Sequence, residues 1–258
     1  MTKIKLDIQY DGTEFAGFQR QPGQRTVQGA LEKALSKITH ESITVFASGR
    51  TDAGVHALGQ VCHFETDAPI PAEKYTYVLR RFLPIDIVVT KGSIAEPSFH
   101  AQFSARWKRY CYQIDLARIP NLLERRFRAH VPQKLNVDNM MEATKYFEGT
   151  HDFTSFCSVK TVVENRVRTI YRCRVIPTEL GLTIEVVGNG FLYNMVRIMT
   201  GTLVGVGRGR FQPQEIQRMI AARDRQAAGP TFSPHGLFLM DVGYKPWSDM
   251  QIADFGSE

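Results

Sequence analysis

The sequence predicts an α+β fold made of two successive domains that repeat one order of strands and helices. Apolar residues alternate with polar ones in some segments, as in β-strands, and recur at helical spacing in others. The 258 residues suffice for two domains, and 43% hydrophobic with 22% charged residues is the composition of a globular protein.

The first half is expected to contain strand, helix, strand, strand, helix and strand. Thr26 is a predicted N-cap, since its side chain can accept a hydrogen bond at the start of the first helix. The order is βαββαβ, that of ferredoxin-like domains. The segments are predicted, in this order, at residues 4–10, 27–38, 43–49, 59–65, 75–82 and 87–94.

The second half repeats this pattern. Its strands are predicted at 107–116, 165–176, 182–188 and 236–244, and its helices at 137–147, 191–203 and 216–222. We therefore expect two ferredoxin-like or RRM-like domains, residues 1–104 and 105–258, with antiparallel sheets facing a central basic cleft.

The positive charge is concentrated in the second half. The chain carries a net charge of +6, and residues 105–174 hold 14 Lys/Arg against 7 Asp/Glu. Strict alternation along residues 165–176 would place four arginines on one face of a strand. That face is either solvated or a groove that follows RNA phosphates. The four are Arg166, Arg168, Arg172 and Arg174, and Arg20 is a further candidate for RNA binding.

Membrane, secretory and metal-binding classes are not indicated. No apolar run approaches the roughly 18 residues of a membrane span, and the N-terminus enters a strand pattern directly. The four cysteines are scattered without metal-ligand spacing, so we expect buried thiols, no disulfide and no metal. A cytoplasmic protein is expected.

The stretch GRTDAGVHALGQV, residues 49–61, carries the strongest chemical signal. Asp-Ala-Gly is a common turn sequence, so Asp52 is either a turn residue or a reactive group. Arg50 lies two positions earlier, and a neighbouring cation would keep the Asp52 carboxylate ionised. An ionised carboxylate on a glycine-lined loop suits nucleophilic or general-base chemistry.

Several motifs together resemble the tRNA pseudouridine synthase A family. They are ASGRTDAGVHALGQVCHFET, YDGTEFAGFQRQ, FHAQFSARWKRYCYQI, HDFTSF, GNGFLYNMVRIMTGTLVGVG and the closing GLFLMDVGY. The resemblance implies that Asp52 is the catalytic residue and that Arg50 takes the place of the extruded base. It further implies that Tyr110 packs against the target uracil and that Arg197 pairs with the catalytic carboxylate, all in one cleft.

The resemblance also implies the reaction and the partners. A uridine in the anticodon stem-loop of tRNA, at position 38, 39 or 40, would be isomerised to pseudouridine without a cofactor or metal, by a homodimer. The sequence leaves open whether Asp52 attacks C1′, adds to C6 or removes the C2′ proton. The family usually has an arginine where this chain has Gln102, which weakens a possible phosphate contact.

Two other functions stay open at this point. One is a pseudouridine synthase that acts on other RNA sites. The other is a noncatalytic RNA-binding module, although the exposed aromatic run that is typical of such modules is not found. A pure binding module would also have no need of Asp52.

Overall fold

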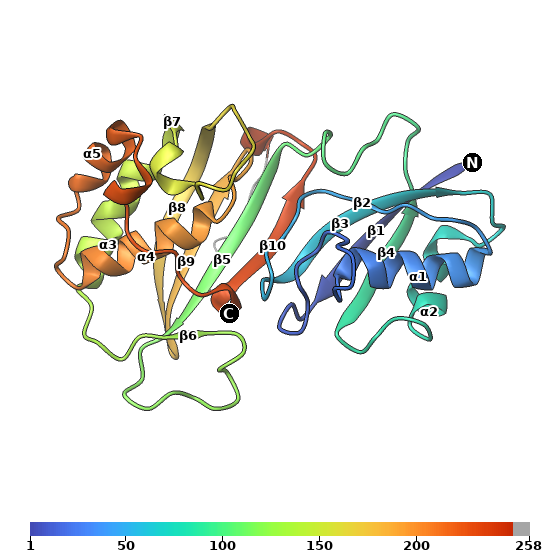
Figure 1. Ribbon diagram of the computed structural model, residues 1–258, viewed down its shortest axis with the longest axis horizontal. Helices are drawn as coiled ribbons and strands as arrows, with labels where there is room; N and C mark the ends of the chain where they lie inside the picture. The colour runs from blue at the N-terminus through green and yellow to red at the C-terminus, as the bar shows by residue number, and fades with distance from the viewer. Residues whose placement is uncertain (250–258) are drawn as a thin grey trace.

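The computed structural model describes residues 1–249 and has the predicted α+β class (Figure 1). Its α-helices are α1 (Val27–Thr39), α2 (Tyr75–Leu79), α3 (Val137–Thr144), α4 (Met195–Gly207) and α5 (Glu215–Ala222). Its strands are β1 (Thr2–Tyr10), β2 (Phe46–Ala47), β3 (His56–Thr66), β4 (Ile87–Ile94), β5 (Trp107–Asp115), β6 (Ala129–His130), β7 (Gly149–Asp152), β8 (Val167–Thr178), β9 (Gly181–Gly188) and β10 (Leu237–Gly243).

The strands of both halves join in one continuous sheet. Its order is β4-β1-β3-β10-β5-β9-β8-β7, with β2 beside β3 and β6 beside β5. The junction is short: β10 runs parallel to β3 through the pairs Phe238–His56 and Leu239–Ala57. The expectation of two separate sheets was therefore wrong, because β10, the last strand among residues 1–249, bridges the halves. The division into domains at residue 104 stays a prediction.

One face of this sheet carries the core of both halves. Tyr10 pairs with Ala57, Ala57 with Leu239 and Leu239 with Tyr110, so these side chains lie in one row on the same face. Figure 1 shows α1 and α4 on one side of the sheet, over the first and second halves respectively, and the core cluster that holds these side chains also includes residues of both helices. This row of buried residues therefore continues the core from the strands of the first half to those of the second half.

The predicted row of four arginines is broken by a β-bulge in β8. Ile170 pairs with Gly188 but Arg172 pairs with Val187, so one extra residue is inserted between them. Arg168 shares the helix-covered face with Ile170, whereas Arg172 and Arg174 point to the opposite face. The interpretation of a single arginine-lined face was wrong, because a bulge shifts the period of alternation by one.

Several element boundaries also differ from expectation. The strand predicted at 43–49 is reduced to the two residues of β2, and the helix predicted at 191–203 begins only at Met195. The short strands β6 and β7 were not predicted, because two to four residues are too few for a pattern to emerge. The expectation of buried thiols was correct for all four cysteines.

Candidate active site

Asp52 lies in the loop between β2 and β3, where the chain leaves one strand and enters its neighbour. A second loop, residues 12–18, packs beside it. The Phe18 amide donates to the Thr51 carbonyl at 3.1 Å, and the Gly54 amide donates to the Phe15 carbonyl at 3.2 Å. The Val55 amide closes a turn on the Asp52 carbonyl at 3.1 Å. The loop that carries Asp52 is therefore held on both sides by backbone hydrogen bonds.

Arg197, on the first turns of α4, is the cation that pairs with Asp52. Its Nη1 lies 3.1 Å from Asp52 Oδ2, and the two side chains are only 16% and 21% exposed. The same nitrogen donates to Asn194 Oδ1 at 2.8 Å, and Nε donates to the Phe232 carbonyl at 2.7 Å. These contacts hold the guanidinium of Arg197 in one orientation. The ion pair joins Arg197 to Asp52, which is 145 positions away in the sequence.

A close backbone approach explains how the Phe232 carbonyl reaches Arg197. A Cβ built on Gly201 would lie 1.9 Å from the Pro230 carbonyl oxygen, so only glycine allows this segment to cross α4. The Phe232 amide also donates to the Arg197 carbonyl at 3.1 Å. The segment at 230–232 is thus anchored to the helix on which Arg197 stands.

Burial and the ion pair act on Asp52 in opposite directions. Desolvation raises the pKa of the Asp52 carboxyl above its ordinary value, while the charge and the hydrogen bond of Arg197 lower it, and the net shift is upward. The expected neighbour Arg50 was the wrong partner for this purpose. Arg197 is the cation that contacts the Asp52 carboxylate, and residues 50–52 lie outside the strands, so the alternation of a strand does not apply to them.

Tyr110 lies on β5 and faces the same side of the sheet as Tyr10. It is 7% exposed, and burial raises the pKa of its phenol well above the ordinary range. Phe191 meets its ring edge to face, with centroids 5.1 Å apart and planes at 80°. Tyr110 is therefore a neutral aromatic surface, which fits both a core residue and a platform for a base.

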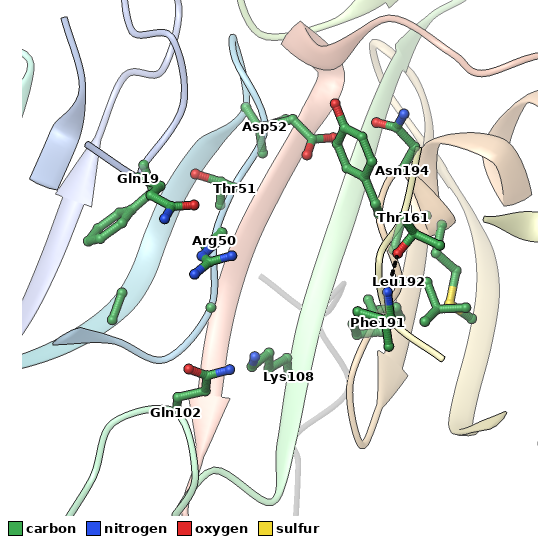
Figure 2. A pocket seen from close by; sticks show the side chains of 18 of the residues that line it. Gln19, Arg50, Thr51, Asp52, Gln102, Lys108, Thr161, Phe191, Leu192 and Asn194 are labelled. Atoms are coloured by element: carbon green, nitrogen blue, oxygen red, sulfur yellow. Dashed lines mark hydrogen bonds between the residues drawn. The ribbon is translucent and has the colours of Figure 1, made fainter. Parts of the chain in front are cut away.

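Arg50, Asp52 and Tyr110 line one cavity of about 670 Å³ between the two halves. Figure 2 shows Arg50 and Thr51 on one side and Thr161, Phe191 and Leu192 on the other, with Lys108 on β5 near Gln102. The Arg50 guanidinium is exposed and forms no ion pair or side-chain hydrogen bond with residues 1–249. It is therefore available to an incoming ligand.

The five candidate RNA-binding arginines lie in different surroundings. Arg168 lines the cavity and donates to the Asn165 and Val167 carbonyls, and Arg166 directly precedes β8. Arg20 is 65% exposed and pairs with Glu32 at 2.9 Å, beside the cavity-lining residue Gln19. Arg168 and Arg20 are therefore placed to contact a molecule that enters the cavity.

Arg172 and Arg174 lie on the far face of the sheet. Arg172 Nε is 2.8 Å from Glu185 Oε1, and its guanidinium lies 5.3 Å from the Trp247 ring centroid. Its side chain is only 12% exposed. The bulge thus turns Arg172 into part of an internal ion pair, away from the cavity.

Sequence reasoning missed several residues of the cavity wall. Lys108 and Asn194 were not proposed for the site, although they stand next to the motif residues Arg109 and Met195. Residues 160–163 form part of the wall in a segment without periodicity, so no pattern could have revealed them. Lys108 and Tyr110 are two positions apart on one strand, so alternation places both side chains on the same face. This spacing could have indicated Lys108 as a residue of the site.

Among residues 1–249, no group of three or more His, Cys, Asp or Glu side chains could hold a metal ion. In the same part of the chain, no helix is long and apolar enough to cross a membrane.

Comparisons with known proteins give a consistent result over nearly the whole chain. A family profile described as tRNA pseudouridine synthase matches residues 8–104 and 143–245. Proteins named tRNA pseudouridine synthase A from Bacillus pumilus and Bacillus subtilis are each 50% identical to it, over 94% of this chain and 99% of theirs. Among solved structures, a Cbf5–Nop10–Gar1 complex aligns with a TM-score of 0.33 and 14% identity, over 78% of this chain and 54% of that chain.

Proposed function

The chain belongs to the tRNA pseudouridine synthase family, and from that membership we propose that it converts uridine to pseudouridine in the anticodon stem-loop of tRNA. The proposed targets are uridines 38, 39 and 40. The enzyme class is that of an isomerase, since the product has the same atoms as the substrate. The N1–C1′ bond of the uridine breaks, the uracil turns and C5 bonds to C1′. The C5 hydrogen leaves as a proton, and N1 takes up a proton, so the atoms balance.

Asp52 is the proposed catalytic residue, and its ion pair with Arg197 at the edge of the cavity is the observation that carries the proposal. Attack on C1′, addition to C6 and removal of the C2′ proton all require an ionised carboxylate. Burial alone works against that charge, and Arg197 counteracts burial. Asp52 in this setting is a poorly hydrated anion held in one orientation, which suits any of the three roles.

Arg50 and Tyr110 are the proposed residues for holding the target nucleotide. A uridine in a stem must leave its stack, which costs a few kcal/mol. The unpaired guanidinium of Arg50 can occupy the vacated place, and the buried Tyr110 ring offers an apolar surface for the uracil. The cavity volume of about 670 Å³ lies within the usual range of pockets for small ligands.

The tRNA would approach from the side that carries Arg20 and Arg168. Phosphate contacts from these two arginines, and from Arg166 directly before β8, would position the stem-loop without reading its sequence. Gln102 also lines the cavity, where it can form hydrogen bonds but not the charged fork of an arginine. We further propose a homodimer that acts in the cytoplasm.

Mapping of the product tests this proposal. Unmodified tRNA is incubated with the protein, and pseudouridine is located by its stable carbodiimide adduct and the resulting stops of reverse transcription. New stops confined to positions 38, 39 and 40 are expected. Stops at other tRNA positions would refute the proposed target, and no stops in any tRNA would refute the proposed substrate.

A further inference from the structure

A buried polar network lies directly behind the segment that carries Arg50 and Asp52. Tyr10, Ser48, Thr51 and Gln60 are all less than 7% exposed, although each bears a polar side chain. The Tyr10 hydroxyl shares a hydrogen bond with Thr51 Oγ1 at 2.8 Å, and the Ser48 hydroxyl donates to Gln60 Oε1 at 2.7 Å. Buried groups of this kind are costly unless they are paired, and these four are paired with one another.

Gln60, on β3, is the centre of this network. Its amide nitrogen donates to the Gly49 carbonyl at 2.9 Å and to the Tyr10 hydroxyl at 3.3 Å. Both amide hydrogens and the amide oxygen are therefore used. Gln60 holds the backbone immediately before Arg50, and through Tyr10 it reaches the Thr51 hydroxyl immediately after Arg50.

Lys108 holds the same segment from the opposite half of the sheet. Its Nζ donates to the Ser48 carbonyl at 2.7 Å, and Figure 2 shows the side chain reaching from β5 toward the segment of Arg50. A Cβ on residue 49 would lie 2.7 Å from this Nζ, so Gly49 leaves the space that the ammonium group fills. Lys108 thus spans the place where the two halves of the chain meet.

Lys108 is half-buried, and its surroundings are unfavourable for a positive charge. Burial, with a contribution from the charge of Arg168, lowers the pKa of Lys108 to about 8. No carboxylate among residues 1–249 forms an ion pair with it. An apolar side chain would fill the same space without the penalty for a desolvated charge. Groups kept at such a penalty are characteristic of functional sites.

We propose that Gln60 and Lys108 are positioning residues, which fix the backbone of residues 48–51 so that Arg50 and Asp52 face the cavity. Neither residue needs to touch the reacting atoms. Gln60 acts from behind the loop, and Lys108 locks the loop of the first half onto β5 of the second half. The catalytic consequence rests on the proposed function, whereas the structural consequence does not.

The test compares Gln60→Leu and Lys108→Met with matched substitutions elsewhere in the sheet. Gln113→Leu removes a glutamine of β5 that accepts a hydrogen bond from Thr183 at 3.0 Å. Lys5→Met removes a partly buried lysine of β1 that is remote from the cavity. Lys108→Arg keeps a cationic donor. For each protein we measure the single-turnover rate on saturating tRNA, the tRNA dissociation constant, the thermal midpoint and amide hydrogen exchange.

The expected result is a loss of rate without a loss of binding. A misplacement of about 1 Å at a reacting group lowers rates by up to about 100-fold. We therefore expect a roughly 10- to 100-fold slower turnover in Gln60→Leu and Lys108→Met, dissociation constants within about threefold of wild type, and partial recovery in Lys108→Arg. The peptide covering residues 48–55 should exchange faster in the first two variants only.

Other outcomes would overturn the proposal. Rates and exchange equal to wild type in folded variants would show that the loop needs neither residue. A weaker affinity with an unchanged rate would make Lys108 an RNA contact instead. If Gln60→Leu does not fold, the turnover rate and hydrogen exchange of Lys108→Met alone test the proposal. Faster exchange in the variants, with no turnover by the wild-type protein on any tRNA, would refute the proposed function and leave the positioning of the loop confirmed.

Discussion

Removal of Arg197 is expected to shift the pH dependence of turnover. Arg197→Met leaves a side chain of similar length without the charge that lies 3.1 Å from Asp52. In the wild type, burial raises the pKa of Asp52 and Arg197 lowers it. Without Arg197 only burial remains, so the pKa of Asp52 rises further. Because the ionised form is the active one, the acidic limb of the pH–rate profile should move to higher pH.

The size of the effect follows from the geometry. Two unit charges 3.1 Å apart interact by about 5 kcal/mol at an effective dielectric constant near 20. The side chains are 16% and 21% exposed, so solvent screening reduces this to about 1–3 kcal/mol. That range corresponds to roughly 5- to 150-fold in rate on the acidic limb. At higher pH, where Asp52 ionises without help, the deficit should become smaller.

The assay is the single-turnover release of tritium from tRNA labelled at uracil C5, measured across the pH range in which the protein stays folded. Arg208→Met is the matched control, since Arg208 follows the same helix and contacts Gln133 at the surface. A folded Arg197→Met protein with the wild-type acidic limb would refute the reasoning. It would show that the ion pair does not control the charge of Asp52.

Three further predictions concern other residues. Arg50→Ala should abolish turnover and leave the thermal midpoint unchanged, because the exposed Arg50 side chain forms no ion pair or side-chain hydrogen bond with residues 1–249. Wild-type turnover by this variant would exclude the base-holding role. Arg168→Met should weaken tRNA binding and reduce the slope of log binding constant against log salt concentration by about 1. Arg172→Met should leave tRNA binding intact and lower the thermal midpoint, because Arg172 forms an internal ion pair. Filter binding at several salt concentrations distinguishes the two variants. Gly201→Ala should destabilise the fold by about 1–3 kcal/mol, because its Cβ would meet the Pro230 carbonyl, and an unchanged urea midpoint would contradict that packing.

Local patterns predicted most of the elements, because each element buries one side. The alternation of β1 and the helical spacing of α1 describe faces that pack against the core, and the structure has both within a few residues of the expected bounds. The predicted N-cap was correct: Thr26 accepts a hydrogen bond from the Gly29 amide. Such signals are local, so a single sequence contains them.

What the sequence could not supply depends on contacts between distant segments. The bulge between Ile170 and Arg172 is visible only in the pairing of β8 with β9, and it reversed the side on which two arginines lie. The joining of both halves into one sheet depends on two residue pairs between β10 and β3. The network around Gln60 likewise assembles from four separate stretches of chain.

The candidate site was predicted unevenly for the same reason. The motif resemblance indicated Asp52, Arg50, Tyr110 and Arg197, and the structure brings these residues to one cavity and its edge. Their roles in catalysis stay predictions. Lys108 counted only toward the basic charge near the predicted row of arginines, because a lysine in a strand is usually solvated. Its contact with the Ser48 carbonyl arises only where β5 faces the end of β2.

The most direct test of the account is tritium release from tRNA labelled at uracil C5, compared between the wild-type protein, Asp52→Asn and Asp52→Ala. Bonding of C5 to C1′ must expel that tritium. Release is expected from the wild type and from neither variant, with tRNA binding retained in all three. Release by a folded Asp52 variant at the wild-type rate would contradict the assignment of Asp52 as the catalytic residue.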